Sequence, residues 1–313
     1  MKSILVTGGA GYIGSATVKK LIDDEHKVIV IDNLSKGKKE LVDEKAKFLK
    51  GDLIDYEFLK KVFSQNEFDA VIHFASYKAV EESMDNPEKY SDNIIGTINL
   101  LNIMNKFNVK KLIFSSSAAV YGEPEYVPVD EEHSTNPMSF YGFTKLECEN
   151  IINWYSELKK MVCINLRYFN VAGDAGLNYL DPDPKNVLPI ILEGLKDEKE
   201  FTIFGNDYDT RDGTCLRDYI DINDLVQAHI SALNLNKSET INLGTSEGTS
   251  VLELVNAVEE VLGKKLNYKF SHRRKGDSPS VVASNKKAKQ LLDWSPKKDI
   301  KQMIESTLKA YNS

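Results

Sequence analysis

The chain has 313 residues, of which 42% are hydrophobic and 28% charged, and its formal net charge is −7. This length suits one large domain or a two-lobed molecule with a substantial core. The basic residues are scattered, which argues against a nucleic-acid-binding face, and no apolar run approaches the length of a membrane span.

The cysteines and histidines give little sign of special chemistry. Three cysteines, Cys148, Cys163 and Cys215, have no pairing pattern, which favours thiols in a reducing cytoplasm. The five histidines lack metal-ligand spacing, so we expect no metal. The N-terminal residues enter a strand directly, without a signal-peptide pattern.

In chain order, short apolar runs alternate with helical patterns in the first half, which predicts parallel strands joined by crossover helices. Most of the runs are apolar throughout, as expected of strands buried on both faces. We expect strands at Ser3–Thr7, Lys27–Asp32, Lys47–Gly51, Ala70–Phe74, Lys111–Ser115 and Val162–Arg167, and helices at Ala16–Asp24, Pro87–Asn108 and Phe140–Leu158.

After Arg167 the pattern changes to turn-rich segments and shorter helices. Ser250 and Glu253 have the spacing of a capping box that opens an apolar helix. We therefore expect a larger domain at residues 1–169 and a smaller lobe at 170–313, with residues 215–234 returning to the first. A cleft between two packed lobes is a common place for a ligand.

Gly8, Gly11 and Gly14 lie between the first strand and the first helix. Such glycines let the backbone turn sharply and let a pyrophosphate approach the helix N-terminus. Glycine triplets alone can be a tight turn, but the strand before and the helix after favour a dinucleotide site. The predicted fold class is therefore α/β, a Rossmann-type doubly wound parallel sheet with a smaller C-terminal α/β lobe.

Two carboxylates indicate which dinucleotide binds. Asp32 ends the second strand, where it can accept hydrogen bonds from ribose hydroxyls and would repel a 2′-phosphate, so NAD is favoured over NADP. Asp52 follows the third strand and could bind the adenine amino group. Gly and Asp are also common in turns, so Gly51-Asp52 could instead be a turn.

A serine triplet ending at Ser117 and a Tyr141–Lys145 pair supply acid–base groups. Residues four apart share one helix face. A free tyrosine has a pKa of about 10 and is a poor base, but a nearby ammonium and the positive ring of oxidised NAD favour the phenolate. Tyr141 could then take a proton from a sugar hydroxyl as a hydride leaves, with Ser117 hydrogen-bonded to the same oxygen. An isolated Tyr-x-x-x-Lys is commonly a surface pair; the serines and the glycine motif favour the active-site interpretation.

With these motifs the chain resembles the UDP-glucose 4-epimerase family of extended short-chain dehydrogenases/reductases over nearly its whole length. The resemblance rests on TGGAGYIGS, IDNLS, HFA followed by KAVEES, FSSSAAVYG, YGFTK, LRYFN, IFGNDYDTRDGTCLRDYI, NLGT and residues 273–277. It implies reversible C4 epimerisation of UDP-glucose and UDP-galactose through a 4-keto intermediate, with NAD kept bound, in a cytoplasmic enzyme. It also implies a homodimer formed through two helices per subunit.

The resemblance implies a residue set for each ligand. Arg217 and Arg274 would hold the diphosphate and Asp277 the ribose. Taken alone, Arg217 could be a solvated surface pair and residues 273–275 an exposed basic loop, but the family match favours the binding roles. The cofactor residues implied are Gly8, Gly11, Tyr12, Ile13, Gly14, Asp32, Asn33, Asp52, Leu53, Phe74, Ala75, Lys78, Asn93, Tyr141, Lys145 and Tyr168; the substrate residues are Ser117, Asn170, Asn186, Arg217, Arg274, Asp277 and Val281.

Related enzymes and one non-enzyme are alternatives, and the dehydratases are disfavoured. Nucleotide-sugar 4,6-dehydratases place an Asp-Glu pair after the serines, where this chain has Ala118 and Ala119, which cannot do acid–base work. A UDP-glucuronate 4-epimerase and a non-catalytic NAD-binding protein stay open. Val281 falls at the position that gates the hexose pocket in the family, and its small size implies that N-acetylated UDP-sugars are accepted as well.

Overall fold

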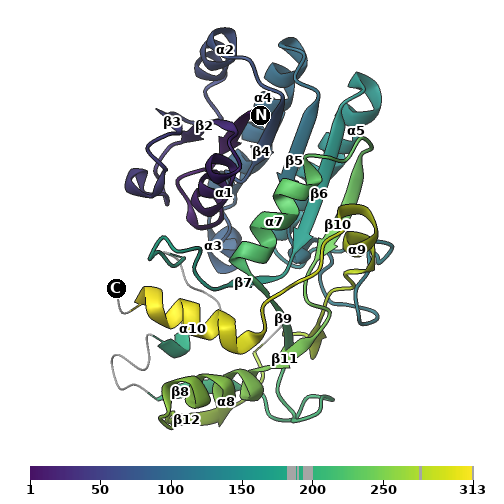
Figure 1. Ribbon diagram of the computed structural model, residues 1–313. Helices are drawn as coiled ribbons and strands as arrows, with labels where there is room; N and C mark the ends of the chain where they lie inside the picture. The colour runs from purple at the N-terminus through teal and green to yellow at the C-terminus, as the bar shows by residue number, and fades with distance from the viewer. Residues whose placement is uncertain (182–187, 189, 193–199, 275–276, 312–313) are drawn as a thin grey trace.

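The structure, a computed structural model, describes residues 1–181, 188, 190–192, 200–274 and 277–311. Its larger part is built on a seven-stranded parallel sheet with the strand order β10-β6-β5-β4-β1-β2-β3 (Figure 1). The strands are β1 (Ser3–Thr7), β2 (Lys27–Asp32), β3 (Lys47–Lys50), β4 (Ala70–His73), β5 (Lys111–Ser115), β6 (Val162–Tyr168) and β10 (Glu239–Leu243).

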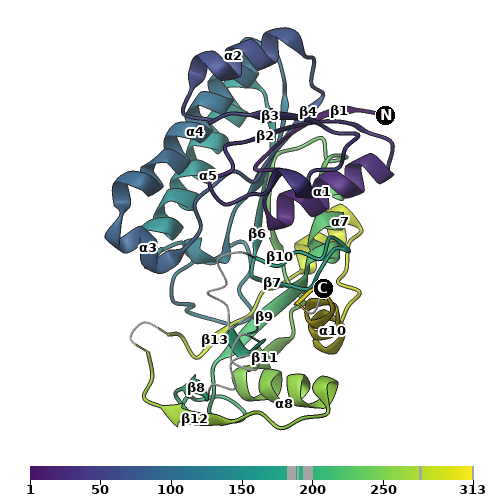
Figure 2. The same ribbon diagram turned by 90° about the vertical axis from the view of Figure 1, so that its left-hand side faces the viewer.

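Helices cover both faces of this sheet (Figure 2). Along β1, Leu5 packs toward one helical layer and Ile4 and Val6 toward the other, because side chains alternate along a strand. One layer contains α2 (Tyr56–Gln65), α4 (Pro87–Lys106) and α5 (Phe140–Lys159); the other contains α1 (Tyr12–Asp23), α7 (Ile222–Ala232) and α9 (Lys286–Leu292). A short helix, α3 (Val80–Asp85), precedes α4. The predicted doubly wound α/β fold is confirmed.

The smaller part contains two small sheets. A four-stranded sheet has the order β11-β9-β13 with β7 on β9, and β8 pairs with β12. The elements are β7 (Asn170–Ala172), β8 (Phe201–Phe204), β9 (Leu216–Asp221), β11 (Gly248–Ser250), β12 (Tyr268–Ser271), β13 (Ser280–Val281), α8 (Val251–Leu262) and α10 (Ile300–Tyr311). The predicted capping box is present: the Ser250 hydroxyl accepts from Glu253 N at 3.0 Å, and Ser250 N donates to the Glu253 carboxylate at 2.8 Å.

Several elements end one or two residues from their predicted bounds, and two larger differences concern the first helix and the large sheet. The helix expected from Ala16 begins at Tyr12; this start was missed because Gly14 in its first turn weakens the local helical pattern. Strand β10 was not expected in the large sheet, yet Glu239–Leu243 pairs in parallel with β6. Its partner residues, 164–168, lie about 75 positions earlier in the chain, and a local pattern carries no information on such pairing.

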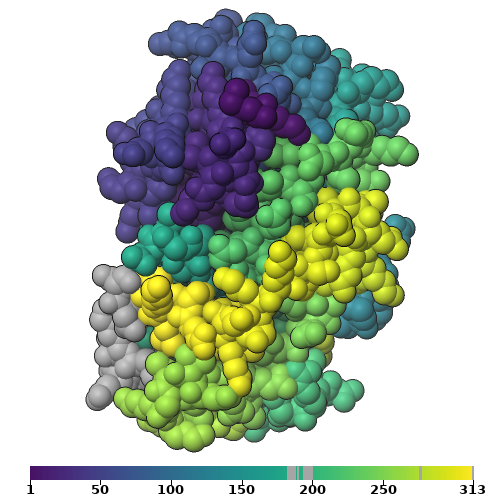
Figure 3. Space-filling view, in the orientation of Figure 1, coloured from purple at the N-terminus to yellow at the C-terminus, as the bar shows by residue number. Residues whose placement is uncertain are grey.

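The chain passes more than once between the two parts. β9 belongs to the small sheet, whereas α7, which follows it, packs on α1, and β10 joins the large sheet. The C-terminal segment crosses the boundary on the face shown in Figure 3. The division at residue 169, with 215–234 returning, stays a prediction; the packing of α7 supports the return. No helix in the described ranges combines the length and apolarity needed to cross a membrane.

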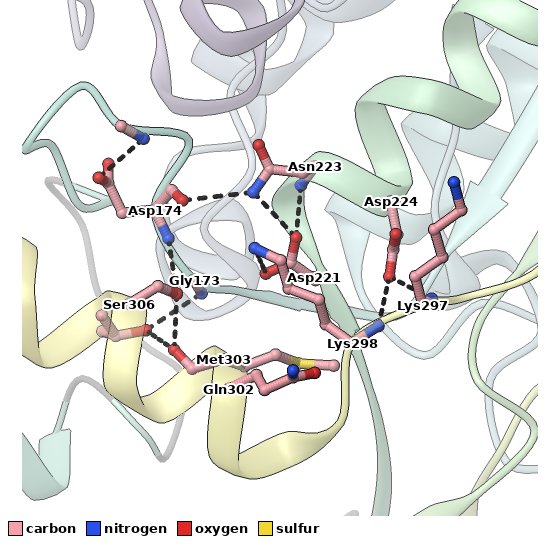
Figure 4. Close-up of polar contacts among 12 residues, drawn as sticks. Gly173, Asp174, Asp221, Asn223, Asp224, Lys297, Lys298, Gln302, Met303 and Ser306 are labelled. Atoms are coloured by element: carbon pink, nitrogen blue, oxygen red, sulfur yellow. Dashed lines mark hydrogen bonds and ion pairs between the residues drawn. The ribbon is translucent and has the colours of Figure 1, made fainter.

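The turn after β7 is fastened on two sides (Figure 4). From α10, the hydroxyls of Thr307 and Ser306 accept from Gly173 N at 3.1 Å and from Asp174 N at 3.3 Å. On the other side, the Asn223 amide donates to the Asp174 carbonyl at 3.3 Å. The buried Asp221 carboxylate caps α7 by accepting from Asn223 N at 2.8 Å. The turn therefore joins α10 to α7.

We expect Gly173→Ala to destabilise the protein. Gly173 has φ +96°, and an added Cβ would lie 2.6 Å from the Asp221 Oδ2 atom. Strain of this kind costs roughly 1–3 kcal/mol in the free energy of unfolding, measurable by urea denaturation. Gly176→Ala is the matched control, because Gly176 also has a positive φ, +77°, but its Cβ would meet nothing within 4 Å. Equal losses in the two variants would contradict the role given to the Asp221 contact.

Candidate active site

A cavity of about 1120 Å³ lies over the C-terminal ends of β1, β2, β4, β5 and β6, bounded on its other side by residues of the smaller part. Open α/β sheets bind ligands at this edge. The structure brings together in its wall all the predicted cofactor residues and four of the predicted substrate residues: Gly8, Gly11, Tyr12, Ile13, Gly14, Asp32, Asn33, Asp52, Leu53, Phe74, Ala75, Lys78, Asn93, Tyr141, Lys145, Tyr168, Ser117, Asn170, Arg217 and Val281.

Gly14 and Gly11 have different roles in the glycine turn. An added Cβ on Gly14 would lie 2.1 Å from the Gly8 carbonyl oxygen, so this glycine permits the close packing of the turn on α1. A Cβ on Gly11 would have only that same oxygen nearby, at 3.4 Å. Gly11 is the N-cap of α1 and provides no side-chain hydrogen bond. The first N–H groups of this 12-residue helix are thus available to a phosphate.

Tyr12 ties the glycine turn to the smaller part. Its hydroxyl donates to the Gly173 carbonyl at 2.5 Å. Burial raises the pKa of Tyr12 well above its usual value, and the carboxylates of Asp181, Asp221 and Asp174 add to this rise. The phenol of Tyr12 is therefore a neutral hydrogen-bond donor. Through its bond to Gly173, the nucleotide end of the cavity is connected to the turn that α10 holds in place.

Asp32 is fixed at the end of β2. Its two oxygens accept from Ala10 N at 3.0 Å and Leu34 N at 2.8 Å. Burial raises the pKa of this carboxyl, and the two backbone hydrogen bonds oppose the rise. Asp52 is oriented by the Asn33 amide, which donates to it at 2.8 Å. Both carboxylates face the cavity with lone pairs free to accept from hydroxyl or amino groups.

Tyr141 and Lys145 lie on the buried face of α5. Ser139 caps this helix by accepting from Gly142 N at 3.1 Å, and Tyr141 N donates to the Ser83 hydroxyl at 3.0 Å. The Ser117 hydroxyl, on the loop after β5, hydrogen-bonds the Tyr141 phenol. The Lys145 ammonium donates to the Ser115 carbonyl at 2.7 Å and lies 5.9 Å from the centroid of the Tyr141 ring. The predicted Ser–Tyr–Lys arrangement is thus assembled at one point of the cavity.

Burial dominates the electrostatics of this group. It raises the pKa of Tyr141 to about 12, and only the Ser117 hydrogen bond opposes the rise. Burial also lowers the pKa of Lys145 to about 8, against the effects of Cys148 and Glu149. Burial thus holds the phenol in its neutral form, and the Lys145 ammonium donates to a backbone carbonyl. The expectation that Lys145 favours the phenolate stays a prediction. The phenolate therefore needs a further positive charge in the cavity.

At the substrate end of the cavity, some of the predicted substrate residues line the wall and others do not. Arg217 lines the cavity, donates to the carbonyls of Leu216 and Ser278 at 2.9 Å, and forms an ion pair with Asp277 at 3.3 Å. The guanidinium of Arg274 instead lies 4.0 Å from the centroid of the Phe204 ring.

Arg274 and Asp277 are therefore not brought to the cavity wall. The π face of Phe204 and the guanidinium of Arg217 hold them in place. Asn186, also predicted to contact the substrate, falls outside the described residues.

One charged residue in the cavity wall was not predicted from the sequence. Asp181 lines the cavity and forms an ion pair with Lys78. Lys78 was expected among the cofactor residues, whereas Asp181 lies in the turn-rich part of the chain after Arg167 and was not among the predicted site residues. A single acidic residue in a turn has no local pattern from which a site role can be predicted.

In the described parts of the chain, no group of three or more His, Cys, Asp or Glu side chains could hold a metal ion.

A doubly wound sheet with a glycine turn after β1 and a Ser–Tyr–Lys group at the end of β5 and on α5 defines the extended short-chain dehydrogenase/reductase class. A family model described as GDP-mannose 4,6 dehydratase matches residues 5–307. UDP-glucose 4-epimerases of Streptococcus mutans and Lacticaseibacillus casei are 44% and 43% identical to the chain, each over 97% of this chain and 95% of their own length. The chain therefore belongs to the UDP-glucose 4-epimerase family.

Solved structures agree with this assignment. A crystal structure of a UDP-glucose 4-epimerase is 42% identical, with a TM-score of 0.95 over 99% of this chain and 97% of that one. The Bifidobacterium longum UDP-glucose 4-epimerase in complex with NAD⁺ and UDP is 37% identical, with a TM-score of 0.90 and coverage of 99% and 98%. The UDP-Glc/GlcNAc 4-epimerase of Campylobacter jejuni is 36% identical, with a TM-score of 0.90 and coverage of 100% and 99%.

Proposed function

We propose that the protein catalyses the reversible C4 epimerisation of UDP-glucose and UDP-galactose through a 4-keto sugar, with tightly bound NAD. The observation that carries this proposal is the convergence of Ser117, Tyr141 and Lys145 on a cavity whose other end is a glycine turn. The relatives named UDP-glucose 4-epimerase support the same reaction.

The nucleotide end of the cavity fits NAD. The space beside Gly11 and the free N–H groups of α1 suit a pyrophosphate, and the carboxylates of Asp32 and Asp52 suit ribose and adenine. The negative charge of Asp32 disfavours the extra phosphate of NADP. NAD held here by the glycine turn, Asp32 and Asp52 would supply the acceptor for the C4 hydride and its donor on return.

The protein's own residues transfer the proton and bind the diphosphate to which the sugar is attached. Tyr141 takes the proton from the 4-hydroxyl, with Ser117 holding the shared oxygen, and Lys145 adds positive charge nearby. The further positive charge that the phenolate needs is that of the oxidised cofactor. Ala118 and Ala119 offer no acid or base for elimination. Arg217 anchors the diphosphate, so that the keto sugar can turn and present its other face.

The test is turnover of UDP-galactose with a coupled glucose readout. We expect the protein to convert it, and Tyr141→Phe to lower kcat by about 10²–10⁴-fold, the usual contribution of a general base. The variant keeps the buried ring, so its NAD content should match that of the parent. A parent protein that binds NAD and converts no UDP-hexose would refute the proposed function.

Val281 supports a wider substrate range. It lies in β13, paired with Arg217 of β9, and its short side chain lines the cavity. We predict that UDP-N-acetylgalactosamine is also converted, and that Val281→Tyr lowers kcat/KM for it, relative to UDP-galactose, by about tenfold or more because the larger ring fills the space of the acetamido group. A parallel kinetic assay with both sugars checks this. An unchanged ratio would rule out Val281 as the gate.

We further propose a cytoplasmic homodimer. The three buried, unpaired cysteines suit a reducing compartment. Helices α4 and α5 pack together and leave large apolar side chains exposed: Ile95 is 46%, Trp154 61% and Leu158 65% exposed. Two such helix pairs could form a four-helix interface that covers these side chains.

Light scattering should give twice the mass of the chain for the parent protein. Trp154→Glu should give the single-chain mass, because the interface would then bury an unpaired charge. Leu291→Glu is the matched control, because it places the same charge at another exposed apolar residue, on α9 in the other helical layer. A parent protein with the single-chain mass would contradict the dimer.

A further inference from the structure

One buried carboxylate lies close to the Ser–Tyr–Lys group and has no part in the chemistry described so far. Glu149 is on α5, one helical turn after Lys145, and is 1% exposed. Arg167 of β6 holds it in a bidentate ion pair, with Nε 2.9 Å from Oε1 and Nη2 2.6 Å from Oε2. The Arg167 side chain is itself 8% exposed. Glu149 is thus an ionised group in the interior, compensated by one partner.

The same carboxylate reaches the loop that carries Ser117. The hydroxyl of Ser116, which is fully buried, donates to Oε1 of Glu149. The preceding residue is held as well: the Ser115 carbonyl accepts from Lys145, and its hydroxyl is 2.6 Å from the Tyr168 hydroxyl. Glu149 therefore provides one of the anchors that set where the loop ends and where the Ser117 hydroxyl points.

The ion pair also extends away from the cavity. Arg167 donates through Nη1 to the Tyr121 hydroxyl at 3.0 Å, and that hydroxyl donates to the Asn242 side chain at 2.7 Å. Buried ion pairs contribute little net stability, because desolvation offsets their attraction, and apolar side chains of similar volume often replace them without loss. The position of this pair, with α5 on one side and the serine loop on the other, favours a role in the reaction.

Glu149 also acts on Lys145 through its charge. Groups around the ammonium come from several elements. Tyr141, Cys148 and Glu149 lie on α5 itself, His73 is on β4, the Phe114 ring on β5 and the Tyr168 phenol on β6.

Most of these groups are uncharged at neutral pH. Burial lowers the pKa of His73 to about 3 and raises that of Tyr168, so both stay neutral. Burial lowers the pKa of Lys145 to about 8, and Glu149 is one of the two groups that oppose this fall.

We propose that Glu149 is a positioning residue for the epimerase reaction: it fixes the serine loop through Ser116 and places its carboxylate one helical turn from Lys145. The inference rests on the proposed function, since it assigns a role within that reaction. Glu149 acts through Ser117 and Lys145, and it does not touch the substrate.

Two variants separate its two effects. Glu149→Gln keeps the shape but removes the negative charge and leaves Arg167 uncompensated. We expect kcat to fall by about tenfold or more. The alkaline limb of the kcat–pH profile should move to lower pH by about one unit, because loss of a neighbouring negative charge lowers the pKa of a lysine. Ser116→Ala removes only the anchor, so kcat should fall while the alkaline limb stays in place.

Glu157→Gln is the matched control, since Glu157 is an exposed glutamate on the same helix. Each variant is also tested for NAD content and for urea unfolding, which report whether the fold and the nucleotide end are intact. If Glu149→Gln does not fold, Ser116→Ala decides: a fall in kcat with KM within about twofold of the parent supports the anchor, because a misplaced Ser117 acts on the transition state.

The outcomes distinguish this inference from the proposed function. A parent protein without turnover refutes the proposed function. A parent with turnover, together with a folded Glu149→Gln whose kcat and alkaline limb match those of Glu157→Gln, overturns the role of Glu149 alone. Parental kcat in Ser116→Ala overturns the anchor in the same way.

Discussion

Parallel strands end at the same edge of a sheet, and the cavity of this molecule depends on that constraint. The loops after β1, β2, β4, β5 and β6 all open onto it, although they are separated by up to about 160 residues along the chain. The glycine turn, the two carboxylates and the serine loop are therefore brought together by the direction of the strands. The smaller part closes the cavity by placing β9 and β13 opposite this edge.

Burial then determines what the acid–base group can do. Burial disfavours the charged states of Tyr141 and Lys145, so Tyr141 holds its proton more firmly and Lys145 less firmly than in water. Both shifts oppose catalysis. A ligand that brings positive charge into the cavity reverses the first, and the negative charge of Glu149 limits the second. Base strength at this site is thus coupled to the presence of the oxidised cofactor, which protects against proton removal at the wrong moment.

Much of this arrangement could be predicted from the sequence because the signals are local. The apolar runs that became β1 to β6, the glycine spacing and the Tyr141–Lys145 pair each lie within a few residues. The remainder depends on contacts between distant segments. The pairing of β10 with β6, the ion pair of Lys78 with Asp181 and the stacking of Arg274 on Phe204 have no local pattern. The raised pKa of the Tyr141 phenol could not be predicted either, because it comes from burial, which a helix face alone does not reveal.

The hydrogen bond between Tyr12 and Gly173 bears on the order in which parts of the site are completed while the chain is synthesised. The residues proposed to bind a dinucleotide lie mostly in the first hundred positions, and they emerge first from the ribosome. Their brace is assembled much later, because the Gly173 turn is held by Ser306 and Thr307 of α10, and α7 and β10 also come from the second half. A nascent chain therefore carries an unfinished nucleotide site through most of its synthesis. We therefore expect the nucleotide site to be completed only when α10 has been synthesised.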